Sequence, residues 1–162
     1  MNKLVLASFV ALLPFSSALA ASVGAIAGSY KLVESKNENG GFCFSDITVK
    51  KGEEGTIDLY RNDVPEMPMY SAPLNGERSY KSSHGEAMST SSNTDSVTVQ
   101  NDVLIFKTVS HVKVLGLPAG RESDAYALKL VDKDTLQAQR KMSTVGVTGV
   151  ENKSASCVYK RN

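Results

Sequence analysis

Neither charge sign dominates this chain, and after its first twenty residues it has no long apolar run. Its 162 residues include 18 lysines and arginines against 17 aspartates and glutamates. Nucleic-acid-binding domains and polybasic membrane-surface proteins normally carry a basic excess, so this balance argues against both classes. No later stretch reaches the 18 consecutive apolar residues that suggest a membrane-spanning helix. The length is that of one ordinary domain.

Residue types that support catalysis or metal binding are scarce. The chain has no Trp, two Cys and two His, and neither Cys-x-x-Cys nor His-x-x-x-His spacing occurs, so we expect no metal site and no cofactor. The motifs of serine hydrolases, P-loop proteins, dinucleotide-binding folds and zinc peptidases are also missing. His84 lies between Ser-rich runs, where a general base beside a Ser is the catalytic alternative to an exposed loop residue. We expect no enzymatic activity.

The first twenty residues have the three-part layout of a secretory signal peptide. Lys3 gives a positive start, an apolar run of about ten residues follows, and Ala18 and Ala20 form a small-x-small cleavage signal. We expect cleavage after Ala20, with residues 21–162 forming a single domain in the periplasm or outside the cell. Without Lys3 that domain carries 17 bases and 17 acids, so it is formally neutral.

The only cysteines are Cys43 and Cys157. In an exported protein an even number of cysteines is typical of disulfide bonding, so we expect one bridge between them. The alternative is two free thiols, one of them catalytic, but no neighbouring residue in the sequence lowers a thiol pKa in an obvious way.

Short alternating segments separated by turn residues predict β-strands rather than helices. In residues 56–61, for example, Ile57 and Leu59 alternate with Asp58 and Tyr60. Turns are expected at residues 37–41, which contain Asn-Gly, and at residues 51–55, 101–102, 116–120 and 132–134. Seven to nine strands at this spacing suggest a barrel or a sandwich.

Residues 62–95 lack this regular alternation, begin with three prolines and end rich in Ser. We expect a long irregular stretch there, with one strand at residues 78–81. Within it, Met67, Met69 and Tyr70 are adaptable apolar residues that suit a lid at a barrel mouth or a contact with a partner. They are our candidate ligand-binding residues, and the alternative is that they cap the open end of the core.

Both ends of the chain resemble the calycins, the group that includes lipocalins and fatty-acid-binding proteins. Residues 28–37, Gly-Ser-Tyr-Lys-Leu-Val-Glu-Ser-Lys-Asn, resemble their first strand, with Tyr30 at the position where the family prefers Trp. Residues 157–161 resemble the last strand of the fatty-acid binders, although Cys157 replaces the Arg that holds a ligand carboxylate. The resemblance implies an antiparallel up-and-down β-barrel of about eight strands. First and last strands would pair, Arg161 or Lys160 would cover Tyr30, and a Cys43–Cys157 bridge would fit this closure.

Two kinds of function follow from these expectations. A barrel of this size can carry a small hydrophobic ligand in its interior. Alternatively, the protein is a periplasmic protein-binding module, such as a protease inhibitor that uses residues 21–27 or the 62–95 segment, or a structural envelope protein. In either case we expect a monomer with no nucleic-acid partner and no membrane span.

Overall fold

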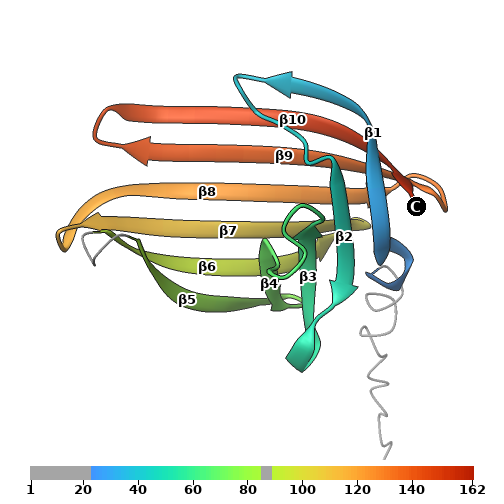
Figure 1. Ribbon diagram of the computed structural model, residues 1–162, viewed down its shortest axis with the longest axis horizontal. Helices are drawn as coiled ribbons and strands as arrows, with labels where there is room; N and C mark the ends of the chain where they lie inside the picture. Colours follow the sequence, from blue (N-terminus) through green and yellow to red (C-terminus); the bar gives the residue numbers. More distant parts are fainter. Residues whose placement is uncertain (1–22, 85–88) are drawn as a thin grey trace, which may run out of the picture.

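The computed structural model describes residues 23–84 and 89–162, with only the backbone given for Ser83 and His84. The expected signal peptide, residues 1–20, lies outside these ranges. The described chain folds into ten strands (Figure 1): β1 Gly28–Glu38, β2 Asp46–Lys51, β3 Thr56–Arg61, β4 Tyr70–Pro73, β5 Gly76–His84, β6 Ser89–Gln100, β7 Val103–Val114, β8 Leu117–Leu130, β9 Thr135–Gly146 and β10 Gly149–Arg161. A helical turn at residues 23–26 and the short 3-10 helix η1 Glu53–Gly55 are the helical segments of these ranges, and neither is long and apolar enough to cross a membrane.

All ten strands belong to one antiparallel sheet, in the order β4-β3-β2-β1-β10-β9-β8-β7-β6-β5. First and last strands are neighbours, with Tyr30 opposite Arg161. The two ends of the sheet approach each other where Leu74, after β4, forms a parallel bridge with Val97 of β6. The backbone N–H of Asn75 donates to the Val97 carbonyl there, at 2.7 Å. The fold is therefore an all-β, nearly closed barrel.

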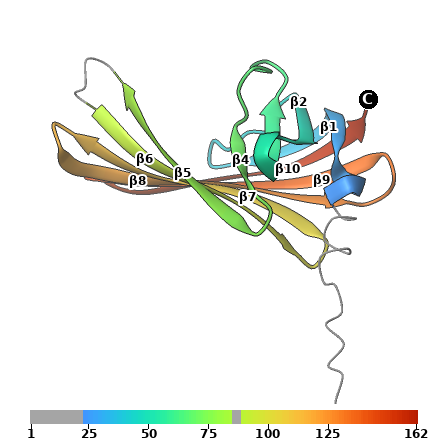
Figure 2. The same cartoon turned by 90° about the horizontal axis from the view of Figure 1, so that it is seen from below.

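Differences in strand length divide the molecule into a barrel end and a free end. Strands β2 to β4 have only four to six residues, whereas β6 to β10 have 12 to 14. The short strands cross the long ones at the end of the sheet that holds the C-terminus (Figure 1). The remaining halves of the long strands project away from this barrel end as a twisted, open wall (Figure 2).

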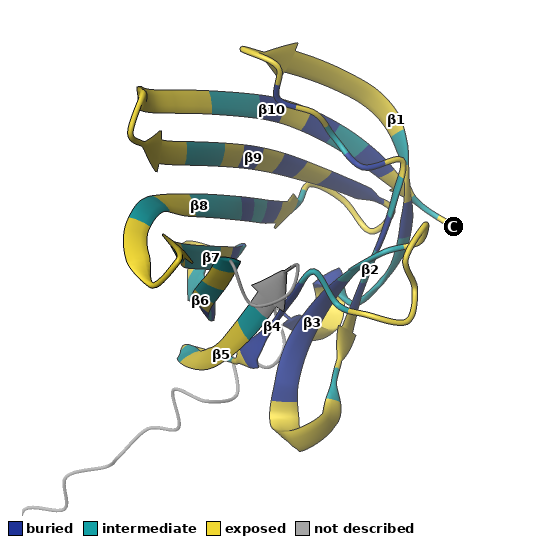
Figure 3. Cartoon of the chain, turned by 60° about the vertical axis from the view of Figure 1, so that its left-hand side comes forward, coloured by how far each residue is buried: buried dark blue, intermediate teal, exposed yellow. Residues whose placement is uncertain are grey.

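The core lies at the barrel end, because only there do two layers of sheet face each other. Its largest fully buried side chains are Tyr30, Tyr126, Tyr159 and Phe106. Burial along the long strands is concentrated toward the barrel end, and exposed positions predominate toward the free end (Figure 3). The free end therefore has little apolar packing of its own.

The expected disulfide between Cys43 and Cys157 is present and links the β1–β2 connection to β10. Several turn predictions are also confirmed. Asn39-Gly40 and Asn101-Asp102 adopt positive φ angles between adjacent strands.

Ten strands, rather than about eight, form the sheet because residues 62–95 are mostly regular. They contain β4, β5 and the first half of β6, so the expectation of a long irregular stretch was wrong, whereas the strand expected at residues 78–81 is confirmed as part of β5. Hydroxyl side chains line both strands of this region, as in the Ser82–Ser91 and Ser79–Thr94 pairs at 2.7 and 3.1 Å. Such strands lack the apolar–polar contrast that sequence analysis relies on.

The break expected at residues 116–120 is present but shorter than expected. Only Leu115 and Gly116 turn, and β8 starts immediately at Leu117. Pro118 is compatible with the strand because it lies near the end of the hairpin, at a register irregularity between β7 and β8.

Candidate functional site

The three candidate ligand-binding residues do not form one patch. Met67 is 70% exposed in the loop before β4, Met69 is half-buried against the core, and Tyr70 is buried. The Tyr70 ring packs against Phe106, with ring centroids 5.9 Å apart. Of the three, only Met67 is freely available to a partner.

The end of the barrel next to β1 is closed by Arg161 and the helical turn at residues 23–26. The guanidinium of Arg161 lies 5.1 Å from the centre of the Tyr30 ring and donates to the Tyr30 hydroxyl at 2.8 Å. It also donates to the carbonyl oxygens of Ala25 and Ala27. Val23 and Ile26 are buried in the core. Residues 23–27, which belong to the segment considered for protease contact, are therefore tied to the barrel.

Aromatic side chains and their hydroxyl groups fill the middle of the barrel. The hydroxyls of Tyr126 and Tyr159 are 2.5 Å apart, and Tyr159 donates to the Phe44 carbonyl at 2.9 Å. Burial raises the pKa of Tyr159 to about 12, so this hydroxyl stays protonated at physiological pH. The polar groups of these large side chains are thus satisfied by one another and by the backbone.

A charged cluster lies where the barrel opens into the wall. Arg140, only 7% exposed, makes two hydrogen bonds to the Asp124 carboxylate, at 2.6 and 3.1 Å. Its guanidinium also lies 4.4 Å from the centres of the Phe42 and Phe44 rings. Burial, followed by the charge of Asp124, raises the pKa of Tyr70, whose hydroxyl has no hydrogen-bond partner among the described residues.

Asp95 is a buried acid on β6, beside the seam of the barrel. It accepts hydrogen bonds from the Thr108 hydroxyl at 2.6 Å and from the backbone N–H of Ser71 at 3.2 Å. Burial raises its pKa, while these two donors and the nearby Arg78 oppose that rise. Asp95 therefore connects β4 to β6 and β7 across the gap between the edges of the sheet.

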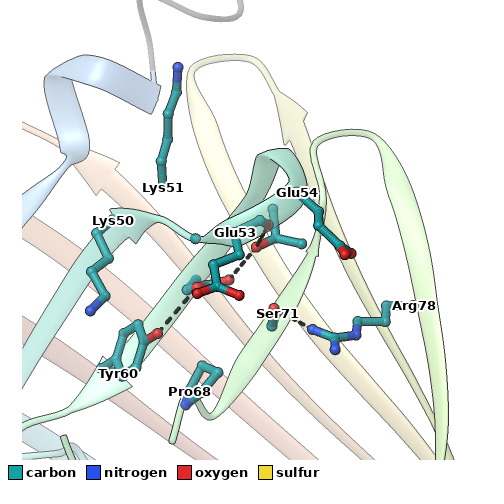
Figure 4. Close-up of a pocket in the computed structure, with 11 residues that line it drawn as sticks. Lys50, Lys51, Glu53, Glu54, Tyr60, Pro68, Ser71 and Arg78 are labelled. Atoms are coloured by element: carbon teal, nitrogen blue, oxygen red, sulfur yellow. Dashed lines mark hydrogen bonds between the residues drawn. The ribbon is translucent and has the colours of Figure 1, made fainter. Parts of the chain in front are cut away.

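A polar hollow of about 520 Å³ lies on the outer face of β2, β3 and β4, beside η1 and β5 (Figure 4). The side chains of Thr56, Asp58 and Tyr60 point outward into it because Ile57 and Leu59 point into the core. Arg78 reaches in from β5 and donates to the Ser71 hydroxyl at 3.2 Å. The hollow thus joins groups from four strands and one turn.

Asp58 is the centre of the hollow's floor. Its carboxylate is buried, and it accepts hydrogen bonds from the Thr56 hydroxyl at 2.8 Å and the Tyr60 hydroxyl at 3.2 Å. Gly52 is necessary for this arrangement, because a Cβ there would lie 1.9 Å from Asp58 Oδ2 and 2.4 Å from Thr56 Oγ1. Burial and the Asp58 carboxylate raise the pKa of Tyr60, which keeps it a hydrogen-bond donor.

Charges of both signs surround this floor. Lys50, Lys51 and Arg78 oppose Glu53, Glu54 and Asp58, and the ammonium of Lys50 lies 4.1 Å from the centre of the Tyr60 ring. In Figure 4 the side chain of Lys51 points away from the hollow, so it acts at the rim. Such a site suits a polar ligand that bears both donors and acceptors. Across the described ranges, no group of three or more His, Cys, Asp or Glu residues could hold a metal ion.

Other open hollows also occur in the described chain. Two lie on the outer face of the sheet, over β1 and β7 to β10, and another lies at the β9–β10 turn. His111 is exposed on β7, and the His84 side chain lies outside the described part of the chain. Neither histidine is thus shown beside a partner that would support acid–base catalysis.

Sequence reasoning missed the polar hollow, although part of its signal was present. The alternation in residues 56–61 placed Asp58 and Tyr60 on the face opposite Ile57 and Leu59. It could not show that η1 and Arg78 cover that outer face, because the strand expected at residues 78–81 had no predicted neighbour or position in the sheet.

Comparison with known proteins yields no assignment: no family model, no curated protein and no solved structure matches this chain.

Proposed function

We propose that the protein is an exported, non-enzymatic binding module that takes up a polar segment of a partner protein in the hollow around Asp58. The observation that carries this proposal is the contrast between the two candidate sites. The barrel interior is filled by hydrogen-bonded tyrosines, whereas the outer hollow is open and lined by charged groups.

The filled interior weighs against a carrier of small apolar ligands. Such carriers use a concave, largely apolar site that surrounds most of the ligand. Here Tyr30, Tyr126, Tyr159 and Phe106 occupy the space between the sheet layers, and residues 23–26 and Arg161 close one end. The carrier function would require these side chains to move out of the core.

The hollow around Asp58 has the volume of a ligand pocket and is lined by charged groups of both signs. Its volume, about 520 Å³, lies within the range of roughly 300–1,000 Å³ that is typical of ligand pockets. Glu53 and Glu54 attract basic side chains, while Lys50 and Lys51 attract acidic ones. A polar segment that carries both charges would satisfy both halves of the site.

Export and a calycin relationship are parts of the same proposal. A disulfide persists in oxidising compartments, so the Cys43–Cys157 bond supports a location outside the cytoplasm. The contact of Arg161 with Tyr30, together with the pairing of first and last strands, supports descent from a calycin-like barrel. The two additional strands would then be an elaboration of that barrel.

The experiment is native mass spectrometry of the protein purified from its own envelope, combined with charge reversals at the rim. Lys51→Glu with Glu54→Lys changes exposed side chains without touching the Asp58 floor, and Lys133→Glu in the β8–β9 turn is the matched control. We expect a protein complex that the rim variant loses and the control keeps. A bound small molecule in place of a protein partner, or a complex that survives the rim variant, would refute the proposal.

A further inference from the structure

Exposed apolar side chains gather at the free end of the wall, far from the hollow around Asp58. The turns between β7 and β8 and between β9 and β10 both lie at this end (Figure 1). Gly120 pairs with Gly146, so the two hairpins are neighbours in the sheet. Half of the large apolar residues that are exposed in the described chain belong to these hairpin tips: Val114, Leu115, Leu117, Val145, Val147 and Val150.

Leu115 is unusual because its backbone conformation disfavours it. Its φ angle is +52°, in the left-handed region where Gly, Asn and Asp are favoured. The other non-glycine residues with positive φ in the described ranges are all polar: Asn39, Glu54, Asn75, Asn101 and Asp102. Leu115 is also 69% exposed. Neither turn geometry nor core packing therefore explains a leucine at this position.

Charged residues are missing from the tips and begin just behind them. Residues 114–120 and 142–150 contain no Asp, Glu, Lys or Arg. The three positions on either side of each tip segment carry five basic residues, Lys113, Arg121, Arg140, Lys141 and Lys153, against the two acids Glu122 and Glu151. Arg140 is buried and paired with Asp124, and Lys153 pairs with Glu151, so Lys113, Arg121 and Lys141 supply the excess of positive charge. The tips are thus apolar projections with a collar of net positive charge.

We propose that these two hairpin tips insert into the interface of a lipid bilayer that contains anionic lipids. Apolar side chains on a narrow projection can enter the boundary between headgroups and acyl chains, and Lys and Arg behind them can extend toward lipid phosphates. The even charge of the whole chain argues against attachment by charge alone, so we assign the anchor to the apolar tips. This inference is independent of the function proposed for the hollow around Asp58.

The test is flotation of the protein with vesicles made of equal parts phosphatidylglycerol and phosphatidylethanolamine. Protein is purified after export, and mass spectrometry confirms that every variant has the same N-terminus. The tip variant is Leu115→Asn with Leu117→Thr. Because burial of one leucine is worth one to two powers of ten in an equilibrium constant, the tip variant should bind at least about tenfold more weakly.

The tip variant also controls for unfolding, because Asn suits a positive φ better than Leu does. Its melting temperature should be no lower than that of the wild type. A matched variant, Val64→Thr with Val131→Thr, removes exposed apolar residues elsewhere and should float like the wild type. Vesicles of phosphatidylcholine alone should bind the wild type more weakly, owing to the positive collar.

Equal flotation of the tip variant and the wild type would overturn the inference, as would a wild type that does not float. A third contrary result is a wild-type dimer, seen by analytical ultracentrifugation without lipid, that the tip variant abolishes. The tips would then be an interface with a second copy of the chain. A monomeric wild type with a tip-dependent loss of flotation supports insertion.

Discussion

At the scale of single residues, Arg140 shows how the barrel manages a buried charge. Its guanidinium lies against two phenylalanine rings and makes two hydrogen bonds to Asp124, while its Nη1 atom has no partner among the described groups. Removing one member of such a pair leaves the other charge poorly solvated, which costs more than the pair itself contributes. A variant without Arg140 should therefore lose more stability than the Arg140–Asp124 pair itself contributes.

We predict that Arg140→Ala lowers the free energy of unfolding by about 3 kcal/mol, measured by urea denaturation. The value is at the lower end for a buried ion pair because Asp124 remains partly accessible to water. Arg140→Lys should recover only part of the loss, since an ammonium cannot make the two parallel bonds to Asp124. Arg121→Ala, at an exposed position on β8, is the control and should change stability by less than about 0.5 kcal/mol. A similarly small effect of Arg140→Ala would contradict this account.

At the scale of elements, sequence analysis was most successful where apolar and polar residues alternate along a strand. In residues 56–61 the alternation of Ile57 and Leu59 with Asp58 and Tyr60 matches β3 and its two faces. Strands β5 and β6 were predicted only in part, at residues 78–81 and 96–100, because polar residues occupy both faces over much of their length. Their pairing depends on long-range register and hydroxyl contacts, and no local period encodes either of these.

The same limit applies to the candidate site. Asp58 and Tyr60 could be placed on one outer face, but the hollow also needs Arg78 from β5 and Ser71 from β4. These residues meet because the two edges of the sheet approach each other near Leu74 and Val97. Since that closure is a property of the whole sheet, composition and spacing alone could not reveal it.

The helical turn at residues 23–26 is a small element with a large expected effect. Ile26 is 2% exposed, and its carbonyl oxygen accepts a hydrogen bond from the Tyr30 hydroxyl at 2.7 Å. We predict that Ile26→Ala lowers the free energy of unfolding by about 2–4 kcal/mol, because it opens a cavity under this end of the barrel. Val33→Ala, at an exposed position on β1, is the matched control and should have little effect in the same urea experiment. Equal stabilities of the two variants would show that the turn does not seal the core.

At the scale of the whole molecule, closure of the barrel depends on contacts between distant parts of the chain. Strand β1 pairs with β10, so segments near the two ends of the domain must meet before the barrel can form. Long-range pairing of this kind is entropically costly and slow. The Cys43–Cys157 bond joins residues 114 positions apart at this same junction. The bond therefore lowers the conformational entropy of the unfolded chain between the two segments that must meet to close the barrel.

We predict that the double variant Cys43→Ala with Cys157→Ala loses up to about 5 kcal/mol of unfolding free energy, since the chain-entropy cost grows with the length of the closed loop. A reducing agent should lower the melting temperature of the wild type but leave that of the double variant unchanged. This second comparison separates loss of the bond from loss of packing at Cys157, which is buried. If the wild type kept its melting temperature under reduction and showed two titratable thiols beforehand, the bond would not hold the barrel closed. A drop confined to the wild type would instead show that the covalent link, together with the β1–β10 pairing, maintains the barrel end from which the wall and its apolar tips project.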